Sequence, residues 1–104
     1  MSQNRIQLLQ KAIQSNPQDP FPYFGLAKAH EKAGETEKAL QQYDFLIKNH
    51  PDYGGTYYHY VILLMESEEW DKAEKVCEQG LKVLLEQNNQ QLYSELLMLK
   101  EQNL

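Results

Sequence analysis

The chain has 104 residues, a formal net charge of −5 at pH 7 and a single cysteine. Its acidic and basic residues are interspersed, which argues against binding to nucleic acid or to an anionic membrane surface. No apolar run approaches the roughly 18 residues of a membrane span, and no apolar signal segment follows the N-terminus. We therefore expect a soluble, cytoplasmic, single-domain protein whose partners include neither nucleic acid nor membrane.

The first predicted helix runs from Ser2 to Asn16. One side of it is apolar and consists of Ile6, Leu9, Ala12 and Ile13. A turn with two prolines follows, because a proline disfavours helix in the residue before it. Asp19 is expected to cap the next helix, with Pro20 at its first position.

Two helices are predicted next, from Phe21 to Ala33 and from Glu35 to Asn49. The first has an apolar stripe with helical spacing: Tyr23, Leu26, Ala27 and His30. The second has a matching stripe: Ala39, Tyr43 and Leu46. Gly34 separates the two helices and Pro51 ends the second. Large and small side chains alternate, so the sequence predicts a close antiparallel hairpin.

A second hairpin and a final helix complete the chain. Its first helix is expected to fray before Thr56, because Gly54 and Gly55 weaken its start, and to end at about Glu66. Its second helix is expected from Trp70 to Gln87. After Asn88 and Asn89, either of which can cap a helix, a leucine stripe predicts a last helix to about Gln102.

The pattern of the first hairpin recurs after 34 residues. Tyr23 corresponds to Tyr57, and Ala39 to Ala73. In the other direction the first helix corresponds to the second half of a repeat, since Pro17 corresponds to Pro51. A fixed period in this range is typical of stacked helical hairpins.

These residues resemble the tetratricopeptide repeat pattern, W-x2-L-G-x2-Y followed by A-x3-F and P. The first repeat has Tyr23-x2-Leu26-Ala27-x2-His30, then Ala39-x3-Tyr43 and Pro51. The second departs from the pattern at Val61, which replaces a small residue, and at Leu85, which replaces the proline. Val61 predicts slightly wider helix spacing, and Leu85 predicts that the helix continues past the usual end.

The resemblance implies an all-α fold, a short right-handed superhelix of antiparallel hairpins. We expect a single domain with an N-terminal capping helix that is half a repeat (residues 1–18), repeat one (19–52), repeat two (53–87) and a C-terminal capping helix (88–104). In this family the first helix of each hairpin lines the concave inner surface. The resemblance therefore implies that a partner binds there.

The faces of these first helices that lie beside the core stripe give the predicted binding residues. They are Phe21, Phe24, Lys28, Tyr58, His59, Ile62 and Glu66. Such a face, aromatic with charges of both signs at its edges, suits an extended or helical peptide with apolar anchors. The alternative is that the two phenylalanines pack on the N-terminal helix and Ile62 on a neighbouring repeat.

Other kinds of site are disfavoured. Some family members bind a chaperone C-terminus through a clamp of lysine, arginine and asparagine. Here the matching first-helix positions hold Phe24 and Lys28, and His59 stands at the asparagine position of the second repeat, so this clamp is disfavoured. No histidine pair has metal-ligand spacing, so neither a metal nor another cofactor is expected. His30 is expected to be buried and bonded to a neighbour, and Cys77 to be an inert core thiol, so we expect no catalytic residues.

The predicted function is non-catalytic protein–protein interaction through the concave helical surface, with a peptide or a protein segment as partner. Two alternatives remain. One is a self-assembly module, for example a homodimer, in which Phe45 or the ends of the repeat array pair with a second copy. The other is a small adaptor that resembles a co-chaperone.

Overall fold

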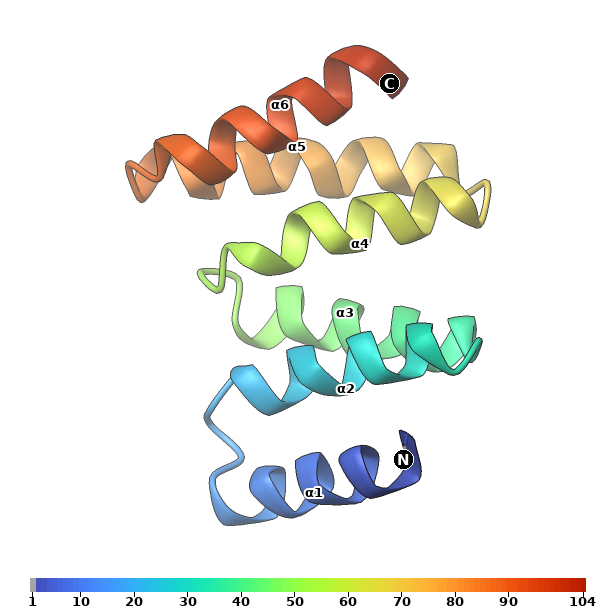
Figure 1. Cartoon of the computed structure of the whole chain (residues 1–104). Helices are drawn as coiled ribbons and strands as arrows, with labels where there is room; N and C mark the ends of the chain where they lie inside the picture. Colours follow the sequence, from blue (N-terminus) through green and yellow to red (C-terminus); the bar gives the residue numbers. More distant parts are fainter. Residues whose placement is uncertain (1) are drawn as a thin grey trace. The chain divides into compact units, whose positions relative to one another are not determined.

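The computed structural model describes residues 2–104, with side chains from residue 4 onward, and contains six helices in this range (Figure 1). They are α1 (Ser2–Ser15), α2 (Phe21–Lys32), α3 (Thr36–Asn49), α4 (Gly55–Glu66), α5 (Trp70–Glu86) and α6 (Gln90–Asn103). No strand occurs in the described range, and the predicted all-α fold of about two helical hairpins is confirmed.

The chain forms two compact units, one ending at His50 and one beginning at Pro51. In the first unit α2 packs against both α1 and α3. In the second, α5 packs against both α4 and α6, and α6 also contacts α4. Each unit is therefore a set of three helices in which neighbours along the chain are neighbours in space.

The core of the first unit matches the predicted stripes. Ala27, Ala39, Tyr43 and Leu46 have no exposed surface. A second group of side chains joins α1 to α2 and consists of Ile6, Leu9, Ile13, Leu26 and Ala29. A Cβ on Gly25 would lie 2.9 Å from Leu9 Cδ2, so a glycine at this position lets the two helices approach closely.

The core of the second unit also matches the prediction, but it differs from the first in the sizes of the side chains that meet where its helices cross. Tyr57, Tyr60 and Val61 on α4 have no exposed surface. They face a helix with a glycine at the crossing, because a Cβ on Gly80 would lie 2.7 Å from Tyr57 Cβ. The absence of a side chain at Gly80 is thus what leaves room for Tyr57 where α4 and α5 cross.

The start of α4 differs from the expectation. The helix begins at Gly55 rather than at Thr56, and Gly54 already has helical backbone angles. A Cβ on Gly54 would lie 2.7 Å from Leu84 Cδ2 on α5. Gly54 therefore serves close packing at a helix end, which outweighs the low helix propensity of glycine.

The three turns between α2 and α3, α4 and α5, and α5 and α6 are built alike. Each contains one residue with positive φ: Gly34 (77°), Glu68 (59°) or Asn88 (58°). In each, the following N–H donates to a carbonyl five residues earlier, as in Glu35 N–H to His30 O at 2.8 Å. This is the hydrogen-bond pattern of a Schellman helix end. The α5–α6 connection thus repeats the turn used within a hairpin.

The end of α5 confirms one consequence of the missing proline. Leu85 lies within the helix, and α5 has 17 residues where α3 has 14. Asn88 then adopts the left-handed conformation, and Asn89 caps α6 by accepting a hydrogen bond from Leu92 N–H at 3.2 Å. Asn88 therefore forms the turn, and Asn89 is the residue that caps the helix.

Candidate functional site

The predicted binding residues lie on two helices in different units, so each face is described within its own unit. On α2 the residues are Phe21, Phe24 and Lys28, which are three and four positions apart. The helix start that carries them is fixed by Asp19, whose Oδ1 accepts a hydrogen bond from Phe21 N–H at 3.1 Å. The predicted cap is wrong by one position, because Pro20 is the N-cap residue, no side chain caps the helix, and Asp19 acts from the turn before it.

The α2 face combines an exposed ring with a ring that touches the core. Phe21 is 58% exposed. Phe24 is half-buried, and its ring centroid is 6.2 Å from that of Tyr43 on α3. Phe24 therefore contacts the core of the hairpin, and Phe21 is the more accessible of the two rings.

Charged groups extend the α2 face toward the end of the helix. Lys28 Nζ lies 3.8 Å from Glu31 Oε2, and the same oxygen accepts a hydrogen bond from the Tyr43 hydroxyl. Burial, and then the adjacent Glu31 carboxylate, raise the pKa of Tyr43 well above its ordinary value. Tyr43 therefore stays a neutral donor that holds Glu31 in place beside Lys28.

The α4 face contains Tyr58, His59, Ile62 and Glu66. The first three are half-buried and Glu66 is exposed. The rings of Tyr58 and His59 meet edge to face with centroids 5.7 Å apart. Tyr58, Ile62 and Glu66 are four residues apart along one side of the helix. This side is an apolar strip that ends in a carboxylate.

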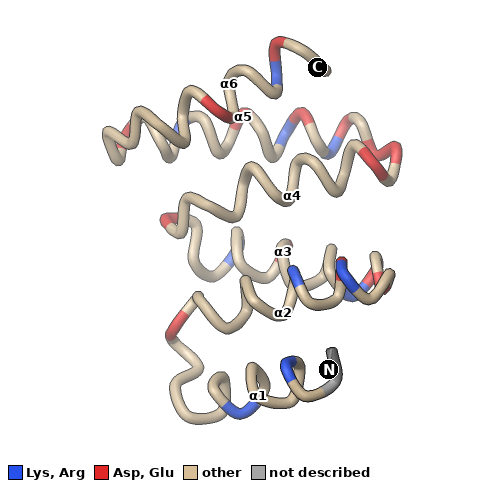
Figure 2. Tube along the Cα trace, in the orientation of Figure 1, with Lys and Arg blue, Asp and Glu red and all other residues tan. Residues whose placement is uncertain are grey.

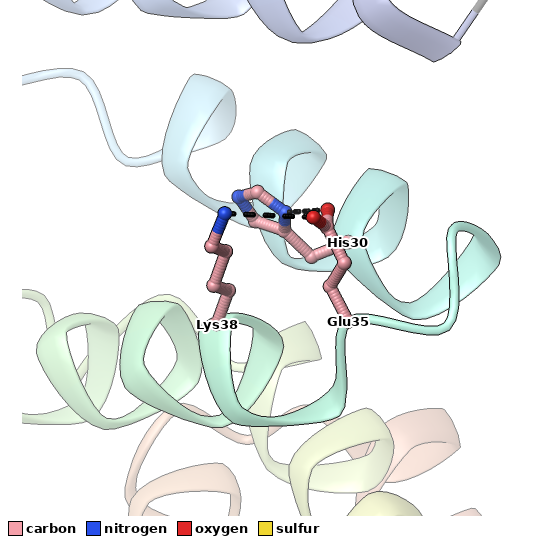
Figure 3. A network of polar contacts seen from close by, with 3 residues as sticks. All are labelled: His30, Glu35 and Lys38. Atoms are coloured by element: carbon pink, nitrogen blue, oxygen red, sulfur yellow. Dashed lines mark hydrogen bonds and ion pairs between the residues drawn. The ribbon is translucent and has the colours of Figure 1, made fainter.

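His30 has a structural role at the end of α2. His30 is 8% exposed, and its Nδ1 lies 2.9 Å from Glu35 Oε1, which confirms the expectation of a buried side chain bonded to a neighbour (Figure 3). Glu35 Oε2 is 3.4 Å from Lys38 Nζ. The hydrogen bond from His30, followed by the charge of Lys38, lowers the pKa of Glu35. This network closes the α2–α3 turn.

Cys77 is fully buried on α5, as expected of a core thiol. Burial raises its pKa to about 11, so the reactive thiolate is scarce at neutral pH. Among residues 2–104 no three metal-ligating side chains lie together. None of the described helices is long and apolar enough to cross a bilayer.

Comparison with known proteins places the chain in a family. A sequence model of the family described as Suppressor of forked protein (Suf) matches residues 4–101. A tetratricopeptide repeat domain protein from Salinibacter ruber is 35% identical to this chain in both its crystal and its solution NMR structures. The chain belongs to the Suf family and is a tetratricopeptide repeat protein.

Solved tetratricopeptide repeat structures agree with this fold. The Salinibacter crystal structure has a TM-score of 0.77 over 82% of this chain and 94% of its own. The NMR structure has a TM-score of 0.80 over 85% and 89%. The TPR2B domain of yeast Sti1, solved as a complex with pHsp70, is 19% identical, with a TM-score of 0.77 over 93% of this chain and 83% of that one. None of the curated protein sequences compared with the chain matches it.

Two aromatic side chains of this tetratricopeptide repeat protein lie differently from a simple reading of the pattern. Phe45, for which the sequence suggests an outward contact, is 37% exposed and stacks on Tyr23 with centroids 4.6 Å apart. His50 lies beside both rings. Trp70, at the start of α5, is 48% exposed.

Two surface hollows were missed by sequence reasoning. One lies on α1 and is lined by Asn4, Arg5, Leu8 and Leu9. The other lies at the α5–α6 turn and is lined by Leu84, Leu85, Asn88, Asn89, Gln90, Tyr93 and Ser94. The sequence gives little indication of either hollow, because Leu8 and Leu85 are single apolar residues outside the core stripes. Both are 66% exposed.

Proposed function

We propose that the chain is a non-catalytic interaction module that binds a peptide or a segment of a partner protein along the first helices of its hairpins. The observation that carries this proposal is the exposure of the predicted faces. All seven of their residues lie outside the buried core, and Phe21 is 58% exposed. An exposed aromatic beside charged groups is the kind of anchor point that peptide-binding helices use.

The chemistry of the faces favours a ligand with both apolar and charged groups. On α2 the aromatic rings are followed by Lys28, and on α4 the apolar strip ends in Glu66. A peptide with an apolar side chain flanked by charged ones would match either face. The Sti1 domain in complex with pHsp70 supports a peptide-binding role for this fold. We propose the cytoplasm as the site of action, with no nucleic acid or membrane partner.

The proposal is tested by removing exposed apolar groups from the faces. In a Phe21→Ala, Tyr58→Ala double variant we expect capture of the partner from an extract of the native host to be lost, with an unchanged helical CD spectrum. Leu85→Ala is the control, because Leu85 is an exposed apolar side chain that lies on α5 and outside the predicted faces. Partners identified by mass spectrometry are then titrated as purified peptides. Equal capture by the wild type and the double variant would refute the proposal.

A further inference from the structure

The outward face of α1 carries a basic stripe interrupted by one apolar side chain. Arg5, Leu8 and Lys11 are three residues apart and all exposed, so they lie along one side of the helix. Leu8 is 66% exposed and lines a hollow together with Arg5. The helix α1, Ser2–Ser15, contains no acidic residue. We name Arg5, Leu8 and Lys11 the basic stripe.

The outward face of α6 carries the opposite pattern. Glu95, Met98 and Glu101 are also three residues apart and all exposed. Met98 is 58% exposed and occupies the central position, as Leu8 does in the basic stripe. The one lysine of α6, Lys100, lies 2.5 Å from Glu78 Oε1 on α5 and is not part of this row. We name Glu95, Met98 and Glu101 the acidic stripe.

The two halves of the chain differ in charge in the same way as the two stripes. Residues 1–50 contain six basic and five acidic residues, whereas residues 51–104 contain four basic and ten acidic residues. Figure 2 shows only basic positions on α1, whereas acidic positions cluster at the turn between α4 and α5 and occur together with basic ones along α5 and α6. Attraction between the α1 side of one copy and the α6 side of another is therefore favoured over pairing of like surfaces.

The packing of α1 indicates what kind of element fits against it. Leu9 of α1 corresponds by the 34-residue period to Tyr43 of α3, which is covered by a hairpin partner and has no exposed surface. Leu9 is only half-buried, because it packs on α2 at one side and borders the hollow at the other. A helix laid antiparallel against α1 would complete the hairpin. The helix α6 has the same length as α1, 14 residues.

We propose that two copies of the chain bind each other through these stripes, with α1 of one copy packed antiparallel on α6 of a second copy. In this arrangement Leu8 meets Met98, Arg5 meets Glu101, and Lys11 meets Glu95. The contact joins two different surfaces of the chain, the basic stripe of one copy and the acidic stripe of another. Because it consists of one helix pair with charges at its edge, it is weak and sensitive to salt.

The test is sedimentation equilibrium of the full chain over a concentration series at low and high salt. We expect the weight-average mass to rise with concentration at low salt and to remain that of the monomer at high salt. In the Arg5→Glu, Lys11→Glu variant and in the Glu95→Lys, Glu101→Lys variant, association should weaken by about tenfold or more. A Lys75→Glu, Lys82→Glu variant, with the same charge change on α5, is the control and should associate as the wild type does.

Mixing the two charge-reversed variants provides the decisive arm. Each alone presents like charges on both stripes, but together they restore opposite charges, so the mixture should regain association. Circular dichroism at the same concentrations checks that each variant is folded. The proposal is overturned if the wild type stays monomeric at low salt, or if the mixture associates no better than its components. Capture of another protein through α2 and α4 is a separate measurement, and its outcome does not decide this one.

Discussion

The hydroxyl of Tyr57 donates a hydrogen bond to the carbonyl oxygen of Pro51, 2.5 Å away. Thirty-four residues earlier the hydroxyl of Tyr23 donates to the carbonyl oxygen of Pro17 at 3.0 Å. Both bonds tie the first helix of a hairpin to the proline turn before it. The repeat is therefore visible in its polar contacts as well as in its apolar stripes.

Replacing Tyr57 with phenylalanine should destabilise the protein by about 0.5–1.5 kcal/mol, the usual net value of one hydrogen bond. Burial raises the pKa of Tyr57, which agrees with a sheltered hydroxyl. Tyr23→Phe should cost less, because its bond to Pro17 is exposed. Urea unfolding of both variants measures the difference. Equal losses of unfolding free energy in the two variants would show that burial of the hydroxyl does not determine how much the hydrogen bond stabilises the protein.

Glycine substitutions should separate close packing from helix propensity. Gly80→Ala should destabilise by about 1–3 kcal/mol, because its Cβ would lie 2.7 Å from Tyr57 Cβ, which cannot swing away as a flexible side-chain end can. Gly55→Ala should be neutral or stabilise by up to about 1 kcal/mol, because no atom lies within 4 Å and alanine favours helix. Thermal melts of the two variants should therefore shift in opposite directions.

Glycine should improve the turn between α4 and α5. Glu68 has a φ of 59°, a conformation that costs an L-residue with a Cβ roughly 1–2 kcal/mol. We expect Glu68→Gly to stabilise the protein by up to about 1 kcal/mol, since the greater freedom of glycine in the unfolded chain offsets part of the gain. Asn88→Gly should gain less, because asparagine tolerates this conformation. A larger gain at residue 88 in urea unfolding would contradict this ranking.

The contact between His30 and Glu35 should make stability depend on pH. The pKa of Glu35 is lowered in the fold, chiefly by the hydrogen bond with His30, so its contribution is present above the ordinary carboxyl pKa. It is lost as the pH falls through the lowered value. Glu35→Gln should therefore reduce the urea midpoint at pH 7, and the difference from wild type should vanish in strong acid.

The second repeat offers a control for this measurement. Glu69 occupies the position that corresponds to Glu35, but Leu64 stands where His30 would be. A Glu69→Gln variant should therefore lack the pH-dependent difference. If both variants lose the same stability between acid and neutral pH, the histidine contact is not the cause.

Cys77 provides a chemical measure of opening. Its side chain has no exposed surface and its pKa is raised to about 11. Because it is the only cysteine, any reaction with a thiol reagent reports on this site alone. At pH 8 the folded protein should react far more slowly than the urea-unfolded chain. Comparable rates in both states would place the thiol outside the core.

The helices and the core could be predicted because burial follows a local period. Ala39 and Ala73, 34 residues apart, both have no exposed surface. Gly80 shows what such a pattern omits, because its importance depends on the ring of Tyr57 from another helix. The size of a side chain across a helix crossing is a tertiary property. For the same reason the start of α4 at Gly55 differs from the prediction, which placed the firm part of the helix after Thr56.

The candidate faces were predictable only as positions on a helix. Periodicity places Phe21 and Phe24 beside the core stripe, but the ring contact of Phe24 with Tyr43 depends on the neighbouring helix. The stripes on α1 and α6 were not recognised. Leu8 and Met98 stand beside other apolar residues in the sequence, and the matching charges around them emerge only when the two helices are compared.

The three left-handed turns at Gly34, Glu68 and Asn88 bear on how quickly the chain reaches its native state. Each brings together helices whose contacting residues are close in sequence, so little entropy is lost when a loop closes. Chains dominated by such short-range contacts fold within microseconds to milliseconds. We therefore expect rapid collapse of each hairpin, with proline isomerisation before α2 and α4 as the source of any slow phase.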